Sequence, residues 1–160
     1  MLIPFELFVM LVLANGAPVV VAKVLKNRWA APVDGGRLWA DGRPVLGRSK
    51  TWRGLIAGII TCALFSLVTG LGLIFGALFG LLALLGDIVS SFVKRRLGLL
   101  SSGRAVGLDQ IPEALLPMIL AMFWLPLSVL DGLLIVALFT LSNIYFSPIL
   151  YRLGIRRHPH

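Results

Sequence analysis

The stretch "LLGDIVSSFVKRRLGLL", residues 84–100, places a carboxylate inside an apolar run and follows it with three consecutive basic residues. Asp87 lies seven residues before Lys94, which is about 10 Å, or two turns, along a helix axis. Spacings of four and three residues put Asp87, Ser91 and Lys94 on one helix face. If this helix crosses a membrane, Asp87 lies inside the apolar layer and needs a wet cavity, a partner cation or a metal ion.

The composition indicates that the surrounding medium is lipid. Apolar residues make up 58% of the 160 residues and charged residues only 14%, and the mean hydropathy is +0.95. A chain of this length cannot hide so much apolar surface in one small water-soluble core. The single cysteine, Cys62, excludes a disulfide framework and a cysteine zinc site, and its apolar surroundings predict a small buried residue.

Five apolar segments are long enough, some with help from interfacial residues, to cross about 30 Å of hydrocarbon as helices. They lie at residues 2–24, 54–70, 72–93, 114–130 and 133–151. The short turns "TGLG" and "LDG" predict two antiparallel hairpins, from the second and third segments and from the fourth and fifth. No basic residue precedes the first segment, so we expect it to remain as an anchor. The sequence therefore predicts an all-α integral membrane protein with five transmembrane helices in a single domain, residues 1–160.

The charge distribution predicts the orientation of these helices. A Lys or Arg at the bilayer centre costs roughly 2.5–3.5 kcal/mol, so the formal charge of +8 must lie outside the hydrocarbon. All fifteen Lys and Arg fall on one side, at Lys23, in the loops 26–53 and 94–113, and in the tail with Arg152, Arg156 and Arg157. The positive-inside rule then places the N-terminus outside and the C-terminus in the cytoplasm of a multi-pass protein of the cell membrane. His158 and His160 are expected to belong to a solvated tail.

The first basic loop, 26–53, is long for so small a protein and is rich in glycine, as in "DGGRLWADGRPVLGRSKTWRG" at 34–54. Its interleaved tryptophans favour order, so we expect a folded cap on the cytoplasmic mouth of the bundle. Glycines let the backbone approach an anion, and Lys50 and Arg53 can reach over the same ligand. The GxxxxGK[ST] pattern of a P-loop is absent. A phosphate site and a basic loop that contacts anionic lipid headgroups both remain open.

A second group of acids follows in "GLDQIPEALL", residues 107–116. Pro112 suits the first turn of a helix, which places Glu113 where the helix dipole favours an acid. Glu113 therefore has a structural role open to it beside a metal-binding one. Asp87 and Asp109 supply hard oxygen ligands of the kind that Mg²⁺ prefers, with Glu113 as an auxiliary.

The basic residues around these carboxylates complete a predicted magnesium–nucleotide site, in which carboxylates hold the metal and cations neutralise the phosphates. The cations expected to hold phosphates are Lys50, Arg53, Lys94 and Arg95, and the expected hydroxyl donors are Ser49, Thr51 and Ser91. A simpler alternative for Asp87 is a salt bridge to Lys94 or Arg95 at the end of its own helix.

Four motifs carry a resemblance to a known family. "NGAPV" at 15–19, the loop at 34–54, "GDIVSSFVKRRLGL" at 86–99 and "LDQ" at 108–110 resemble the CDP-archaeol synthase family, in order and across nearly the whole chain. The last two are also similar to CDP-diacylglycerol synthases. The resemblance implies Mg²⁺-dependent transfer of CMP from CTP to a lipid phosphate, that of unsaturated archaetidic acid or a related phospholipid, with release of pyrophosphate. It implies that Asp87 and Asp109 bind the metal and that Lys50, Arg53, Lys94 and Arg95 bind the phosphates.

One position departs from the family pattern. Family members commonly continue "LDQLDF", whereas this chain reads "LDQIPE", with Pro112 in place of a second aspartate. Either Glu113 reaches the same ligand field or the metal is held with one carboxylate fewer. The departure leaves diacyl phosphatidic acid open as an alternative substrate.

The expected partners are CTP, an anionic lipid phosphate and the bilayer, and no nucleic acid. The small residues Gly72, Gly76, Gly80 and Ala83 suit a groove for lipid tails, close helix packing, or contacts in a homo-oligomer. Asn15 either lines the cavity or bonds to another helix. A non-enzymatic transporter subunit or lipid-binding scaffold is the alternative function. A CDP-alcohol phosphotransferase does not fit, because "DGGR" at 34–37 matches only the start of its signature.

Overall fold

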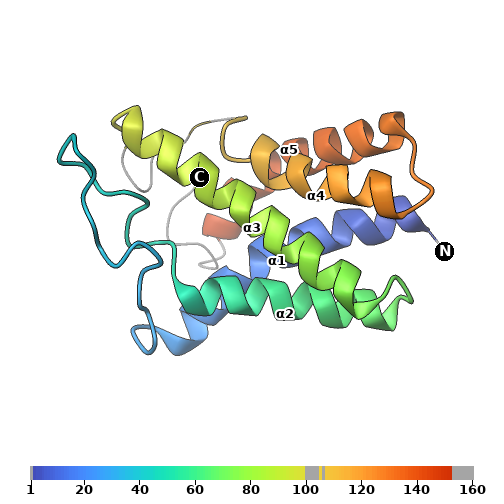
Figure 1. Cartoon of the computed structure of the whole chain (residues 1–160), viewed down its shortest axis with the longest axis horizontal. Coiled ribbons are helices and arrows are strands. Elements are labelled where there is room, and N and C mark those ends of the chain that lie inside the picture. Colours follow the sequence, from blue (N-terminus) through green and yellow to red (C-terminus); the bar gives the residue numbers. More distant parts are fainter. Residues whose placement is uncertain (1, 100–104, 106, 153–160) are drawn as a thin grey trace.

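The protein is a bundle of helices. The computed structural model describes residues 2–99, 105 and 107–152, and the side chains as far as Tyr145. The helices are α1 (Ile3–Leu25), α2 (Trp52–Val68), α3 (Leu73–Arg96), α4 (Ile111–Trp124) and α5 (Val129–Arg152), as Figure 1 shows. The predicted all-α fold is confirmed. Predictions that concern Arg104, Arg156, Arg157, His158 and His160 lie outside the described residues.

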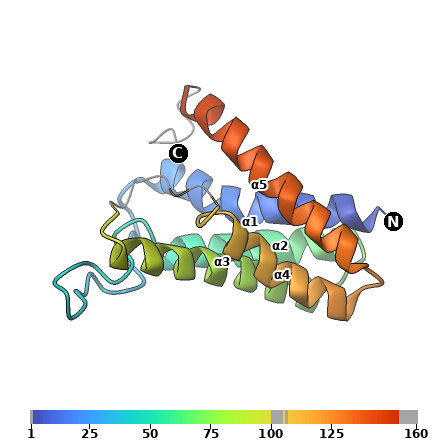
Figure 2. The same cartoon turned by 90° about the horizontal axis from the view of Figure 1, so that it is seen from above.

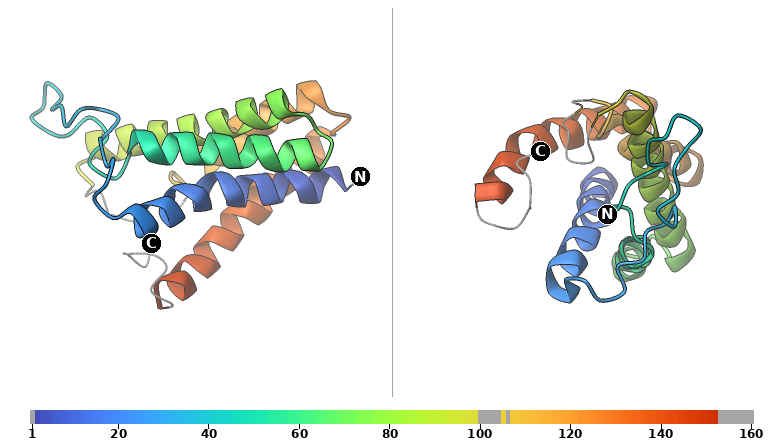
Figure 3. Two further views of the ribbon diagram at one scale, coloured as in Figure 1. Left: turned by 90° about the horizontal axis from the view of Figure 1, so that it is seen from below. Right: turned by 90° about the vertical axis from the view of Figure 1, so that its left-hand side faces the viewer.

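Two of the helices, α1 and α3, are long and apolar enough to cross a membrane on length and composition, whereas α2, α4 and the described side chains of α5 form shorter apolar stretches. The first four helices run side by side (Figure 1). The fifth contacts α4 and α1 and leans away from the bundle toward its C-terminal end, as Figures 2 and 3 show. The long loop between α1 and α2 lies at the end of the bundle opposite the N-terminus.

The hairpin between α2 and α3 turns at "TGLG", as the sequence predicts. Ser66 organises this turn, because its carbonyl accepts hydrogen bonds from the amides of Leu71 and Gly72. Its hydroxyl donates to the Gly72 carbonyl at 2.7 Å. Gly70 and Gly72 adopt φ angles of 82° and 98°, where a side chain would strain the backbone.

The second hairpin turns earlier than the sequence analysis expects. Leu125 is extended, with φ −121° and ψ 157°, because Pro126 disfavours helix at the preceding residue. Ser128 then begins α5, since its hydroxyl accepts from the Asp131 amide while the Asp131 carboxylate accepts from the Ser128 amide and hydroxyl. This reciprocal cap makes the prediction of a turn at "LDG" wrong, because Asp131 and Gly132 lie inside α5.

Glycines in α3 allow close approach of its neighbours. A Cβ on Gly76 would lie 2.4 Å from Ser66 Cβ and 2.5 Å from the Cys62 carbonyl oxygen, and one on Gly80 would lie 3.0 Å from Cys62 Cβ. Close packing of α2 on α3 therefore accounts for both glycines. On another face, a Cβ on Gly86 would lie 2.3 Å from the Pro112 carbonyl oxygen, so the start of α4 rests against α3.

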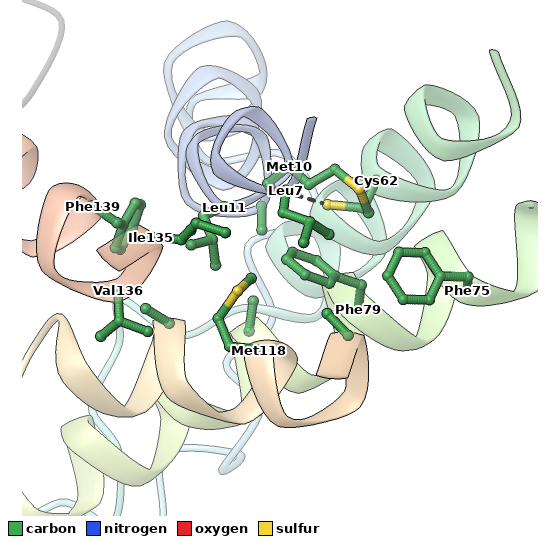
Figure 4. Close-up of a cluster of buried hydrophobic side chains, with 14 of the residues drawn as sticks. Leu7, Met10, Leu11, Cys62, Phe75, Phe79, Met118, Ile135, Val136 and Phe139 are labelled. Atoms are coloured by element: carbon green, nitrogen blue, oxygen red, sulfur yellow. Dashed lines mark hydrogen bonds between the residues drawn. The ribbon is translucent and has the colours of Figure 1, made fainter. Parts of the chain in front are cut away.

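The apolar core joins all five helices (Figure 4). Its buried members include Leu7, Met10 and Leu11 of α1 and Phe79 of α3, together with Cys62 of α2, Met118 of α4 and Val136 and Phe139 of α5. Cys62 is fully buried, and its thiol donates to the Met10 carbonyl at 3.4 Å. The prediction of a small buried cysteine is confirmed. Along α3 the buried side chains are apolar as far as Leu84 and polar beyond it, which separates the core from the candidate site.

Candidate active site

The C-terminal half of α3 buries polar side chains in a mainly apolar protein. Ser90, Ser91, Lys94 and Arg95 are all less than a tenth exposed, and Glu113 of α4 is buried as well. Three basic residues at the end of α3 suit the negative end of its dipole. Ser90 is tied down locally by a hydrogen bond from its hydroxyl to the Gly86 carbonyl. The polar groups therefore gather where α3 meets the two loops.

Asp87 is paired with a lysine from a distant part of the chain. Lys50 Nζ lies 2.6 Å from Asp87 Oδ2, and both side chains are about three-quarters buried, with 21% and 26% exposed. Of the partners considered from sequence, the cation is the one observed, but it comes from the loop before α2 and not from Lys94 or Arg95 of the same helix. The pair places one predicted phosphate-binding cation against one predicted metal ligand.

Lys94 forms a second ion pair, in which α3 supplies the basic residue. Its Nζ lies 2.8 Å from Asp109 Oδ1, with 10% and 27% of the two side chains exposed. The other oxygen of Asp109 accepts a hydrogen bond from the Ala105 amide, which holds the carboxylate toward α3. In the first pair α3 supplies the acid and a loop the lysine, and in the second α3 supplies the lysine and the other loop the acid. The two α3 residues lie about 10 Å apart along the helix.

The loop before α2 is folded, as predicted. Its central part is a short hairpin, in which the Trp39 amide donates to the Arg43 carbonyl and the Val45 amide to the Arg37 carbonyl. We call residues 37–45 the loop hairpin. An isolated antiparallel β-bridge between Pro32 and Thr51 closes the base of the loop.

Asp34 binds the two sides of the loop together. Its carboxylate accepts hydrogen bonds from the amides of Gly36, Leu46 and Gly47. Partial burial opposes ionisation, but these backbone hydrogen bonds outweigh it and hold the pKa of Asp34 below its ordinary value. Asp34 thus orders the loop through backbone amides.

The loop hairpin is held on the last turn of α3 by Arg96. The guanidinium pairs with Asp41 at 2.5 Å and donates to the Pro44 carbonyl at 2.6 Å. It also lies over the rings of Trp39 and Phe92, at 5.7 and 5.2 Å from their centroids. Asp41, like Asp34, therefore orders the loop.

Arg53 and Thr51 occupy helix ends. The Arg53 guanidinium donates to the carbonyls of Arg28 and Lys26, just beyond the end of α1. Thr51 is the N-cap of α2, and its hydroxyl accepts from the Gly54 amide at 3.4 Å. Ser49, predicted to donate a hydrogen bond to a phosphate, is exposed beside Lys50. Asn15 donates to the Leu11 carbonyl of its own helix, so neither predicted role for it is observed.

The carboxylates are not assembled into a metal centre. Within the part of the chain that the structure describes, no three His, Cys, Asp or Glu side chains form a group that could hold a metal ion. Glu113 is placed close to α3, because a Cβ on Gly86 would lie 2.6 Å from Glu113 Cα, but it does not complete a triad with Asp87 and Asp109. The donors nevertheless suit Mg²⁺, which is commonly bound by one or two carboxylates together with substrate phosphates.

Comparison with known proteins assigns the family. A family model described as CarS-like CDP-archaeol synthase matches residues 7–74 and 65–160. The chain belongs to the CDP-archaeol synthase family. The resemblance seen in the sequence motifs is thereby confirmed.

Curated relatives in the CDP-archaeol synthase family differ in how much of the chain they match. The CDP-archaeol synthase of Sulfurisphaera tokodaii is 34% identical over 158 residues, 91% of this chain and 88% of its own length. That of Thermococcus kodakarensis is 41% identical over 111 residues, 61% of this chain and 60% of its own length. The chain thus spans about three-fifths of the Thermococcus relative. A solved structure of an intramembrane enzyme for archaeal membrane lipid biosynthesis is 31% identical, with a TM-score of 0.74 and coverage of 88% of this chain and 89% of that one.

Sequence reasoning missed Arg96 as a functional candidate. In the motif "GDIVSSFVKRRLGL" the first two basic residues were assigned to phosphates, and the third was left without a role. One signal was available, since Phe92 and Arg96 are four residues apart and share a helix face, which suits an aromatic–cation contact. The partners on the loop could not be inferred, because they lie more than fifty residues away.

Proposed function

We propose that this membrane protein is a cytidylyltransferase that transfers CMP from CTP to the phosphate of a membrane lipid, giving a CDP-lipid and pyrophosphate. The observation that carries the proposal is the pair of reciprocal contacts, Lys50 with Asp87 and Lys94 with Asp109. Two lysines and two carboxylates, largely buried at one end of an apolar bundle, suit a reaction between two polyanions. The family name supports an archaeal ether lipid, unsaturated archaetidic acid, as the acceptor. Diacyl phosphatidic acid is the alternative.

The reaction needs little from a general base. A lipid phosphate oxygen attacks the α-phosphorus of CTP, the bond from this phosphorus to the bridging oxygen of the β-phosphate breaks, and pyrophosphate leaves with those electrons. The attacking oxygen is already anionic, so the difficulty lies in bringing two negative groups together. Lys50, Lys94 and Arg95 position the phosphates and neutralise their charge, with Ser91 as a hydroxyl donor. Ser49, Thr51 and Arg53 are the further phosphate ligands of this proposal.

The lysines change partners when the substrates bind. The phosphate groups of CTP and of the lipid together carry more negative charge than the two carboxylates. They draw Lys50 and Lys94 away from Asp87 and Asp109. The freed carboxylates of Asp87 and Asp109 would hold Mg²⁺, with Glu113 as an auxiliary ligand. A bound Mg²⁺ would supply positive charge that offsets the negative charge of the leaving group.

We further propose that all five helices cross the membrane, with the N-terminus outside and the site at the cytoplasmic face. The basic loop before α2 and the polar end of α3 lie at the same end of the bundle, opposite the N-terminus (Figure 1). This arrangement agrees with the positive-inside rule. A lipid phosphate can reach the site from the inner leaflet while CTP arrives from the aqueous side.

The test is release of pyrophosphate from CTP and Mg²⁺ by the purified protein in detergent, with unsaturated archaetidic acid and diacyl phosphatidic acid offered in parallel. An Asp87→Asn variant should lose activity by about 100-fold or more. Asp131→Asn, the same chemical change in the first turn of α5, should retain it. Turnover with only the diacyl lipid would replace the substrate and keep the chemistry. No turnover with either lipid by a folded protein would overturn the proposal and favour a lipid-binding scaffold.

A further inference from the structure

The strongest unexplained feature is the contact between the loop hairpin and the last turn of α3. Arg96 makes an ion pair to Asp41, a hydrogen bond to the Pro44 carbonyl and two contacts over aromatic rings. In return, the Arg43 guanidinium donates to the Arg96 carbonyl at 3.0 Å. So many directed contacts on one arginine, whose side chain is only 20% exposed, are more than the end of a helix needs.

A continuous path of contacts leads from this arginine to Lys50. The loop hairpin ends at Val45, and the next two amides, of Leu46 and Gly47, are fixed by Asp34. The Gly47 carbonyl then accepts a hydrogen bond from the Lys50 amide at 3.3 Å, and the Lys50 carbonyl accepts from the Val33 amide at 2.8 Å. The backbone of Lys50 is therefore hydrogen-bonded to the end of the same loop segment that Arg96 binds at Asp41 and Pro44.

The same loop thus contacts α3 at two points. The loop hairpin binds Arg96, and Lys50 binds Asp87. Asp87 lies nine residues before Arg96, which is about 13 Å along the helix. We propose that Arg96 is a positioning residue: it anchors the loop hairpin on α3 and so keeps Lys50 in reach of the substrate phosphates. This inference rests on the proposed function for its kinetic consequence, but not for its structural one.

The kinetic consequence differs from that of a residue that only stabilises the fold. When the anchor is lost, the loop must be ordered by the nucleotide itself, so the KM for CTP rises while kcat at saturation is largely kept. A residue that only stabilises the fold would lower the fraction of active protein, and hence the apparent kcat, at an unchanged KM. We expect Arg96→Met to raise the KM for CTP about tenfold, in line with the loss of a charge-assisted hydrogen bond.

Arg96→Lys should recover part of this loss, because lysine keeps the pair with Asp41 but cannot also reach the Pro44 carbonyl with a planar fork. Arg37→Met is the matched control, since Arg37 lies on the same hairpin with an exposed side chain outside the proposed site. It should leave the KM within about twofold.

A second measurement does not depend on the reaction. Hydrogen–deuterium exchange of residues 37–50 should be faster in Arg96→Met than in the natural sequence and in Arg37→Met, while exchange in α2 stays the same. Faster loop exchange with a raised KM supports the proposal. Unchanged loop exchange, or an unchanged KM beside a lowered kcat, overturns it. If no lipid is turned over at all, the exchange result still decides whether Arg96 anchors the loop, and the failure belongs to the proposed function.

Discussion

Lys50 and Asp87 are 37 residues apart in the chain, yet their charged atoms lie 2.6 Å apart. The contact joins the loop before α2 to the polar half of α3. It also sets a predicted phosphate ligand against a predicted metal ligand. The two side chains therefore act as one unit, and their removal should not be additive.

A double-mutant cycle tests this coupling. We expect Lys50→Met and Asp87→Asn each to lower kcat/KM by about 100-fold, because each removes a charge used in the transition state. The double variant should be little worse than either single variant, because each single variant leaves an unpaired, largely buried charge and the double variant leaves none. Pyrophosphate release measures all four proteins. Losses that multiply in the double variant would show that the two residues act independently.

The contact between α3 and the start of α4 gives a second prediction. Gly86→Ala should lower the free energy of unfolding by about 1–3 kcal/mol, because the new methyl group would meet the Pro112 backbone at 2.3 Å. Activity should fall as well, since Glu113 lies beside this contact. Gly16→Ala is the matched control, because nothing lies within 4 Å of a Cβ there. Denaturant unfolding in detergent compares the two, and equal stabilities would contradict the close packing.

The hydrogen bonds to the Asp34 carboxylate predict that its removal loosens one part of the loop before α2. Asp34→Ala removes the acceptor for the Leu46 and Gly47 amides, so exchange of these two amides should become faster at neutral pH. Hydrogen–deuterium exchange with mass spectrometry measures it. Faster exchange throughout α2 and α3 would mean instead that the whole protein had been destabilised.

The pKa of Asp34 predicts the pH at which the same order is lost. Because the folded-state pKa lies below the ordinary value of 3.8, Asp34 contributes stability that is complete above this pH and is lost as the pH falls through the folded pKa. Trp39 fluorescence should therefore report loosening of the loop hairpin below pH 3.8. In Asp34→Asn this acid transition should be reduced, since the charged acceptor is already missing at neutral pH.

Arg53 allows a structural role and a phosphate role to be distinguished. Its guanidinium bridges the carbonyls of Lys26 and Arg28, which a lysine cannot do with the same geometry. Arg53→Lys should therefore lower the midpoint of thermal unfolding. The proposed phosphate role should in addition raise the KM for CTP, whereas a lowered midpoint at an unchanged KM would leave Arg53 with the structural role alone. Both quantities can be measured on the same preparation.

Local features of the fold were predictable from sequence. The apolar segments marked five helices, and "TGLG" marked a turn, because glycine supplies the positive φ angles found at Gly70 and Gly72. Asp87 was identified from its position in an apolar run alone. The turn before α5 was misplaced because "LDG" looks like a turn, whereas Asp131 completes a cap that begins at Ser128.

What could not be predicted depends on contacts between distant segments. Helical spacing offered Lys94 as a partner for Asp87, and only the folded loop brings Lys50 closer. The glycines of α3 allowed three interpretations until Gly76 and Gly80 were seen against α2. Arg96 is the clearest case, because its partners Asp41 and Pro44 belong to a hairpin that no periodic pattern announces.

The opposite sense of the two ion pairs has a consequence for how the protein is made. Lys50 is synthesised before Asp87, so in the proposed five-helix topology the counterion of Asp87 already exists when α3 enters the membrane. Lys94 precedes Asp109, but it lies at the end of α3, where a lysine can rest at the membrane surface until its partner emerges. In that topology Asp87 is the deeper of the two carboxylates, and its lysine comes earlier in the chain. The proposed site can therefore be assembled without leaving an unpaired carboxylate in lipid.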